Sequence, residues 1–132
     1  MLNTKRFLLL GWLIIIGFNG FTQSGKGYSK TELYFGLSYS EGVITATQWQ
    51  HFLDNYITPS FKDGFTVVNA YGQWFSTRKK VVVKERSMVV VIIHKDSPQA
   101  EASIDHIRAQ YCKMFNQESV LRADEKLESV RF

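Results

Sequence analysis

Residues 65–94 read FTVVNAYGQWFSTRKKVVVKERSMVVVIIH. Phe65 to Phe75 and Val81 to His94 are rich in β-branched and aromatic residues, which is the composition of β-strands. Ser76 to Lys80 is a short polar connection, so the two segments are predicted to form a hairpin. Lys84 to Ser87 interrupts the second segment and indicates either a β-bulge or a break between two strands.

One strand and one helix are predicted before this hairpin. Thr31 to Ser38 alternates apolar and polar residues with a period of two, which is typical of a half-buried strand. A turn over Ser40 to Gly42 leads to a helix that begins at Thr45 with a capping-box pattern and ends before Pro59. The apolar stripe of this helix is Trp49, Phe52, Leu53, Tyr56 and Ile57.

A second helix and strand are predicted after the hairpin. Ser97 and Pro98 are a typical helix start, and Asn116 is a plausible cap at the other end. The apolar stripe of this helix is Ala100, Ile104, Ile107, Tyr111 and Phe115. A strand is expected over Glu118 to Asp124, and Leu127 to Phe132 is predicted to add a short terminal one.

The resulting order is strand, helix, strand, strand, helix, strand. This order predicts an α+β fold, a ferredoxin-like βαββαβ sandwich with one antiparallel sheet and two helices on one face. The alternative, a sheet with helices on both faces, needs more helix than the chain provides. We expect one ferredoxin-like domain over residues 31–132, preceded by a flexible lead-in over residues 23–30.

The N-terminal segment has the layout of a secretory signal peptide over residues 1–22. Lys5 and Arg6 precede an unbroken apolar run from Phe7 to Phe18, which is shorter than the roughly 20 residues of a membrane-spanning helix. Cleavage is expected after Thr22, with Ser24 as the near alternative and an uncleaved anchor as the other interpretation. We therefore expect an exported protein, periplasmic or secreted, with no membrane span after cleavage.

Composition excludes several classes of function. The net charge of +4 falls to +2 when Lys5 and Arg6 leave with the signal segment, so nucleic acid is not an expected partner. Cys112 is the only cysteine, which excludes an intrachain disulfide and a lipid-attachment cysteine behind the apolar run. The sequence has neither a glycine-rich phosphate loop nor histidines at ligand spacing, so we expect no cofactor and no metal site.

Six blocks carry a resemblance to a known family. They are TELYFGL over residues 31–37, Trp49 with Phe52 and Leu53, TPSF over residues 58–61, Asp63-Gly64, YGQW over residues 71–74, and QESVLR over residues 117–122. In this order they resemble the bacterial family of domain of unknown function 3574, whose members look like small exported proteins. The resemblance covers nearly the whole mature chain and implies one domain and export. It implies no activity, so no residue role carries over.

The strand alternation predicts which face of the sheet carries a site. The side chains expected to face the helices are Leu33, Phe35 and Leu37 on the first strand, Val68, Ala70, Gly72 and Trp74 on the second, and Leu121 on the last. The opposite, open face is then expected to gather the candidate ligand-binding or interface residues Glu32, Tyr34, Asn69, Tyr71, Gln73 and Arg122. This mixture of rings, carboxylate and cation is the best candidate site in the sequence.

The run Met88 to Ile93 bears on the use of that face. It is apolar at every position, as in a strand buried on both sides, yet a single sandwich would expose half of it. A contiguous exposed apolar patch usually marks an interface, and tyrosine and arginine are enriched at interfaces. Homodimer formation through paired sheets, a ligand cleft on or between the sheets, and a solvated surface remain the three alternatives.

Two functions are compatible with this site. The leading expectation is a binding or interaction protein that acts as a homodimer on an unknown small molecule or protein. The alternative is a cofactor-independent small-molecule enzyme with a cleft on the open sheet face. In that enzyme Arg122 would hold an anionic substrate, Glu32 or Glu85 would act as base, and Tyr34 or Tyr71 would donate a proton. Glu85 also fits a solvated hairpin edge.

Overall fold

The computed structural model describes residues 27–39 and 42–131. The predicted signal segment, the start of the lead-in, most of the predicted turn at residues 40–42 and the last residue lie outside the described residues. Within the described ranges, no helix is both long enough and apolar enough to cross a membrane.

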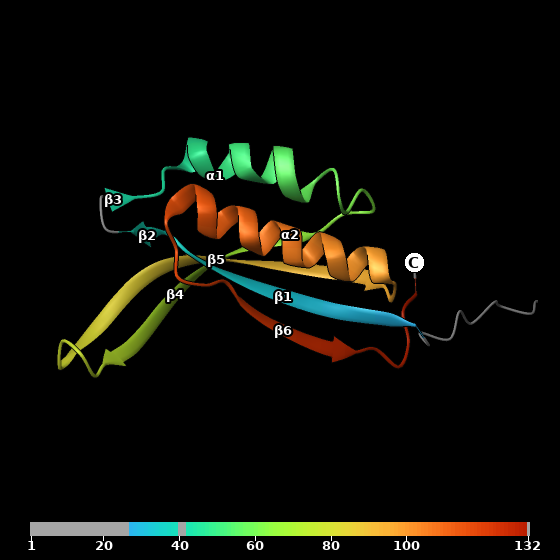
Figure 1. Cartoon of the computed structure of the whole chain (residues 1–132). Coiled ribbons are helices and arrows are strands. Elements are labelled where there is room, and N and C mark those ends of the chain that lie inside the picture. The colour runs from blue at the N-terminus through green and yellow to red at the C-terminus, as the bar shows by residue number, and fades with distance from the viewer. Residues whose placement is uncertain (1–26, 40–41, 132) are drawn as a thin grey trace, which may run out of the picture.

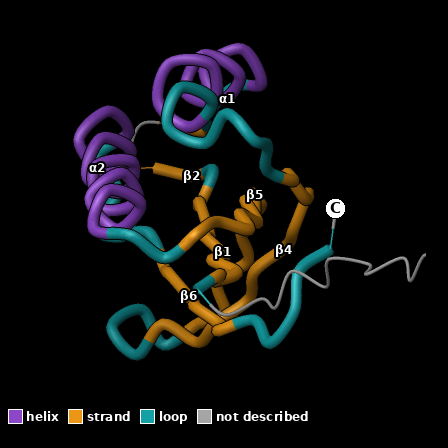
Figure 2. Tube along the Cα trace, turned by 90° about the vertical axis from the view of Figure 1, so that its right-hand side faces the viewer, coloured by secondary structure: helices purple, strands orange, loops and turns teal. Residues whose placement is uncertain are grey.

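One antiparallel sheet forms the base of the fold. Its strands are β1 (Tyr28–Gly36), β4 (Thr66–Ser76), β5 (Val81–Lys95) and β6 (Leu121–Lys126). They are hydrogen-bonded in the order β4-β5-β1-β6, and every neighbouring pair is antiparallel. Both helices lie over the same face of this sheet (Figures 1 and 2). The prediction of an α+β fold with two helices on one face of an antiparallel sheet is confirmed.

The first helix begins and ends close to where its local signals predict. α1 (Ala46–Phe52) opens with the predicted capping box, in which Thr45 accepts from the backbone of Gln48 and the Gln48 side chain accepts from Thr45. It continues as a π-helical turn, η1 (Leu53–Ile57), which the sequence pattern does not distinguish from α-helix. The predicted stripe faces the core along both segments.

The second helix also follows its local signals. α2 (Pro98–Phe115) starts behind Ser97, whose side chain accepts from the Ala100 backbone N–H at 3.1 Å. It ends at Asn116, which has a left-handed backbone with φ of 48°. Asparagine tolerates that conformation better than most residues, so the helix stops where it was predicted to stop.

The core fills the space between the sheet and the two helices. Phe35 from β1 contacts the rings of Trp49, Phe52 and Tyr111 at centroid distances of 5.3, 5.8 and 4.7 Å. The predicted inward residues Leu33, Phe35 and Leu37 are all buried in this cluster. The Tyr111 hydroxyl donates to the Gly36 carbonyl at 2.7 Å, which fixes α2 against the end of β1.

Two details of the strand prediction are wrong. β5 runs from Val81 to Lys95 without interruption, and its register with β4 steps one residue at a time, so no bulge or break occurs at Lys84 to Ser87. Continuous pairing with β4 holds these polar residues in the ladder. At the C-terminus, the described residues up to Arg131 contain only an isolated bridge at Ser129 in place of a terminal strand. A small separate hairpin of β2 (Ser38–Tyr39) and β3 (Gly42–Val43) was not predicted.

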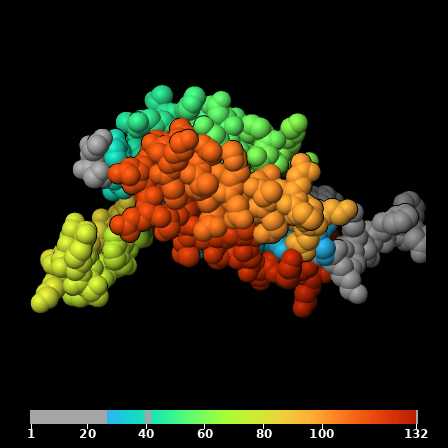
Figure 3. Space-filling view, viewed as in Figure 1, coloured from blue at the N-terminus to red at the C-terminus, as the bar shows by residue number. Residues whose placement is uncertain are grey.

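The β4–β5 hairpin extends beyond the rest of the sheet. β1 ends at Gly36, which pairs with Ser87, and from there only two strands continue. We call residues 71–86 the hairpin arm. It projects from the body of the molecule (Figure 3), and its large apolar side chains are exposed: Tyr71, Trp74, Phe75, Val81 and Val82.

Candidate functional site

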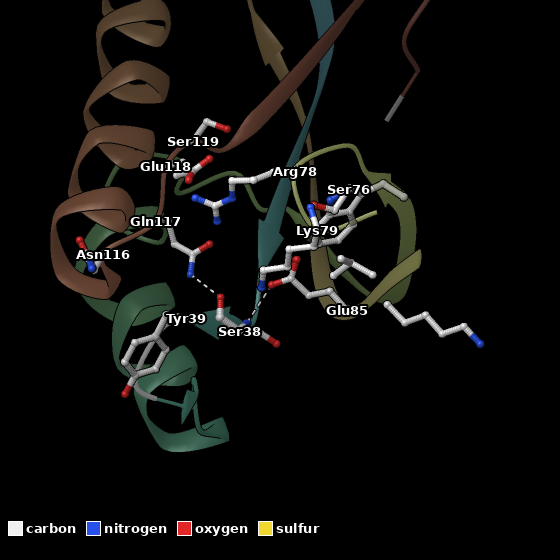
Figure 4. Close-up of a pocket in the computed structure, with 13 residues that line it drawn as sticks. Ser38, Tyr39, Ser76, Arg78, Lys79, Glu85, Asn116, Gln117, Glu118 and Ser119 are labelled. Carbon is white, nitrogen blue, oxygen red and sulfur yellow. Dashed lines mark hydrogen bonds between the residues drawn. The ribbon is translucent and has the colours of Figure 1, made fainter. Parts of the chain in front are cut away.

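A groove of about 820 Å³ lies at the base of the hairpin arm. The arm forms one wall, and β2 together with the loop 116–119 behind α2 forms the other (Figure 4). The volume is in the range of pockets that hold small metabolites. The side chains that matter for its chemistry are Ser38, Trp74, Arg78, Glu85, Gln117 and Glu118.

The Glu85 carboxylate is held in a fixed position in this groove. Its Oε1 atom accepts a hydrogen bond from the Ser38 backbone N–H at 2.9 Å. The Ser38 carbonyl in turn accepts from the Gln117 side-chain amide at 2.8 Å. Figure 4 shows both hydrogen bonds. The arm, β2 and the loop behind α2 are therefore connected through Ser38, and one carboxylate oxygen of Glu85 has a backbone partner.

Two glycines lie next to that carboxylate, one opposite it and one beneath it. Gly72 pairs directly with Glu85 across the β4–β5 ladder, so no side chain lies opposite it on this face. A Cβ atom at Gly36 would lie 2.7 Å from Glu85 Oε1, which is too close for any other residue without movement of the glutamate. Trp74 lies two residues after Gly72 on the same face and is 47% exposed. The result is a hollow that contains a carboxylate beside an indole ring.

The outer part of the groove carries charges of both signs. Arg78, Lys79 and Lys84 come from the arm, and Glu118 comes from the loop behind α2. Arg78 reaches from the arm toward the loop that carries Gln117 and Glu118 (Figure 4). The groove can therefore interact with a cationic group and an anionic group of one ligand.

The open sheet face has a second notable feature, an apolar row across all four strands. Val68, Val89, Tyr34 and Leu121 are consecutive partners in the ladders β4–β5, β5–β1 and β1–β6. We call these four residues the central row. Its two ends are open to solvent, with Val68 46% and Leu121 63% exposed.

A charged network lies beside the central row. The Tyr34 hydroxyl donates to Glu32 Oε2 at 2.6 Å, and Lys30 lies 3.5 Å from Glu32 Oε1 and 2.7 Å from Glu125 Oε2. The hydrogen bond from Tyr34 lowers the pKa of Glu32, and the same bond raises the pKa of Tyr34. At neutral pH the carboxylate thus stays ionised and the phenol stays protonated, which suits binding more than proton transfer.

The predicted position of Arg122 is wrong. Arg122 pairs with the buried Leu33, so it lies on the helix side of β6. There its guanidinium binds Glu101 of α2 at 2.8 Å and Asp124 at 2.8 Å. Leu121 takes the open face in its place. The prediction assumed that Leu121 must face the core. It is wrong because β6 is an edge strand of the sheet, and its contact with α2 is the ion pair between Arg122 and Glu101.

The predicted positions of Asn69, Tyr71 and Gln73 are also wrong. Asn69 pairs with Met88, which pairs with the buried Phe35, so these three side chains alternate onto the helix side. Tyr71 is 63% exposed even so, because the arm continues past the region that the helices cover. The other alternating residues of β4, which were predicted to face the helices, lie on the open side instead: Val68, Ala70, Gly72 and Trp74.

Of the predicted site residues, only Glu32 and Tyr34 come together on the open face. Arg122, Asn69, Tyr71 and Gln73 all lie on the opposite, helix side of the sheet. The sequence argument missed Ser38, Trp74 and Gln117. Gly72 between Tyr71 and Gln73 was a usable signal, because a glycine inside a strand often marks a site of close approach.

The described residues contain no group of three or more His, Cys, Asp or Glu side chains placed to hold a metal ion. They do contain a buried polar chain on the helix side of the sheet. His94 Nε2 lies 2.9 Å from the Thr31 hydroxyl, and that hydroxyl donates to Asp124 at 2.6 Å. Thr31 is fully buried and His94 nearly so.

The fold and groove define a small α+β domain with one antiparallel sheet, helices on one face and a polar groove at one end. Residues 30–132 match the model of the family described as protein of unknown function DUF3574. The chain therefore belongs to that family, as the six sequence blocks predicted. A search of the curated proteins finds no match.

Solved structures show the same fold at low sequence identity. A phage SAM lyase in complex with S-methyl-5′-thioadenosine is 16% identical, with a TM-score of 0.61 over 80% of this chain and 86% of that chain. A phage SAM lyase in the apo state is 18% identical, with a TM-score of 0.56 over 80% of this chain and 85% of that chain. At these identities the likeness concerns the fold alone.

Proposed function

We propose that this protein is an exported binding domain that works as a homodimer, with the open faces of two sheets packed against each other. The observation that carries the proposal is the central row, in which Val68 and Leu121 are exposed on a face without helices. Exposed apolar surface of this kind is favourable to bury.

The charges on the open face support a second copy as the partner. Lys30 pairs with both Glu32 and Glu125 within one chain, so these charges are largely compensated and only one net negative charge remains on this network. A face with an apolar centre and internally paired charges is self-complementary, which a two-fold symmetric interface requires. Tyr34, in the middle of the row, is a residue type enriched at such interfaces.

The Val68→Asp substitution tests this proposal. Val68 is exposed in one chain, so the fold tolerates the change, whereas an unpaired carboxylate in the interface weakens dimerisation by about 100-fold or more. Size-exclusion chromatography with light scattering should report a dimer for the unchanged chain at micromolar concentration and a monomer for the variant.

Val43→Asp is the matched control. Val43 is 58% exposed on β3, beside α1 and away from the open face (Figure 1). This variant should remain a dimer. A monomeric unchanged chain, or equal loss of the dimer in both variants, contradicts pairing through the open face.

We also infer that the domain is of the ferredoxin-like type. The strand order β4-β5-β1-β6, with a helix after β1 and another after β5, supports this assignment. The assignment is compatible with sheet-to-sheet pairing, because all of the helices lie on one face and leave the other free.

A second candidate function is a small-molecule enzyme that acts in the groove at the base of the arm. The carboxylate of Glu85 near the exposed Trp74 favours it, and so does the fold shared with phage SAM lyases. Incubation with S-adenosylmethionine and chromatography for S-methyl-5′-thioadenosine tests that particular reaction. Release no faster than in buffer excludes lyase activity.

A further inference from the structure

We propose that the groove at the base of the hairpin arm binds an amino-acid-type zwitterion that carries a flat body. The inference rests on the second proposed function, the small-molecule site, and specifies the chemical class of its ligand. It requires neither turnover nor dimerisation. Three parts of the groove each recognise one part of such a ligand.

The cationic part of the ligand meets Glu85. Only the Oε1 atom of this carboxylate is used by Ser38, which leaves Oε2 to accept from an ammonium group. Gly72, directly opposite Glu85 in the ladder, leaves the space beside the carboxylate open to an ammonium group, whereas the space over Gly36 is filled by the carboxylate itself. A charge-assisted hydrogen bond in a partly enclosed site is one of the stronger polar contacts available to a ligand.

The flat body of the ligand lies against Trp74. This side chain is 47% exposed although it is large and apolar, and it lines the groove together with Val83 from the paired strand. An indole face favours stacking with aromatic and heterocyclic rings. Since Trp74 and Glu85 are on the same face of the hairpin, one molecule can contact both.

The anionic part of the ligand meets Arg78. Arg78, Lys79 and Lys84 would repel a ligand that is only cationic, while Glu85 and Glu118 would repel one that is only anionic. A zwitterion satisfies both sets, and the guanidinium fork suits a carboxylate. The volume of about 820 Å³ leaves space for a body larger than an ordinary amino-acid side chain.

Three probes separate these contributions in a titration followed by calorimetry with the full chain. S-adenosyl-L-homocysteine has the amino-carboxylate and a flat base, S-methyl-5′-thioadenosine has the base without the amino-carboxylate, and L-methionine has the amino-carboxylate without the base. We expect the first probe to bind at least about tenfold more tightly than either of the other two, because each contact contributes.

Variants assign the contacts to residues. Glu85→Gln keeps an oxygen for the Ser38 N–H but loses the charge, and Arg78→Gln loses the guanidinium; each should weaken binding of S-adenosyl-L-homocysteine by about tenfold or more. Glu125→Gln, on the open face outside the groove, is the matched control and should change the affinity by less than about twofold. Circular dichroism checks that each variant is folded.

Two results overturn the inference. One is the absence of binding by S-adenosyl-L-homocysteine at millimolar concentration, and the other is binding that Glu85→Gln and Arg78→Gln leave unchanged. Both results can be told apart from failure of the proposed functions. A failed lyase assay does not change the titration, and light scattering of the same variants measures the dimer separately.

Discussion

At the scale of single residues, the helix side of the sheet holds a polar chain that the alternation pattern did not reveal. Thr31 is fully buried and connects His94 to Asp124 through one hydroxyl. Burial alone would raise the pKa of Asp124, but hydrogen bonds from Thr31 and Arg122 outweigh it, so this pKa is lowered from its usual 3.8. Each group in the chain has a partner, which is why the polar atoms are tolerated beside the core.

The Thr31→Val substitution should therefore destabilise the protein. Valine has a similar shape but no hydroxyl, so His94 and Asp124 lose a hydrogen-bond partner, at a cost of about 1–3 kcal/mol in the free energy of unfolding at neutral pH. Urea denaturation measures the change. Thr31→Ser keeps the hydroxyl and should lose less; an equal loss would show that packing alone is responsible.

The hydrogen bonds between His94, Thr31 and Asp124 also predict that the stability of the protein depends on pH. Because the pKa of Asp124 is lowered on folding, its contribution to stability is complete above 3.8 and is lost as the pH falls below that value. The unfolding free energy of the unchanged protein should thus fall on acidification in this range. The Thr31→Val variant lacks one of the hydrogen bonds that lower this pKa, so its unfolding free energy should decrease less on acidification. Denaturation at pH values from 5 down to 2 measures this difference.

At the scale of secondary-structure elements, the helix ends were predictable, whereas the faces of β4 and β6 were not. Thr45, Gln48, Ser97 and Asn116 act within one helical turn of their own position, so the sequence contains the complete signal. The side that β4 presents depends on its register with β5 and β1, which local sequence does not contain.

Thr45→Ala tests the capping box of α1. Loss of the side-chain oxygen leaves the Gln48 backbone N–H without its cap, which should lower the unfolding free energy by about 1 kcal/mol. Thr47→Ala is the matched control, since Thr47 lies inside the helix and alanine is the better helix former there. A loss in Thr47→Ala as large as that in Thr45→Ala would contradict a capping role.

At the scale of the whole molecule, the two faces of the sheet have different tasks. The helices bury the helix side of β1 and of the part of β5 beside it, while the helix side of β4 stays exposed. The open face keeps the central row and the charged network, and the arm extends past both helices (Figure 1). The groove arises where the arm, β2 and the loop behind α2 meet. Gly72, Trp74 and Glu85 alternate onto the same side of the sheet as Val68 and Tyr34, so the proposed ligand site continues the open face toward the arm. Light scattering and the ligand titration measure the two proposals separately.

Export is the remaining prediction at this scale. Residues 1–30 fused to alkaline phosphatase, which folds to an active enzyme only outside the cytoplasm, should give active reporter if Lys5, Arg6 and the apolar run behind them act as the predicted signal peptide. Replacing Leu13 and Ile15 by Arg interrupts the apolar run and should abolish the activity. Equal reporter activity with and without the substitutions would rule out a signal peptide.

The sequence by itself determined the two helices, the four strands of the main sheet, their order and the face of the first strand. Period-two alternation with Leu33 and Phe35, and helix caps with a consistent apolar stripe, are local properties, and they were sufficient for the α+β fold and for the pairing of Glu32 with Tyr34 on one side. Family membership followed from the same local blocks.

Tertiary structure alone decided the rest of the site. Arg122 pairs with α2 because the register of β6 sets it opposite Leu33, and Glu85 is fixed because Gly36 and Ser38 reach it from another part of the chain. These contacts join residues far apart in sequence, and a shift of one residue in register reverses every side chain of a strand. The groove therefore became visible only once the sheet was assembled.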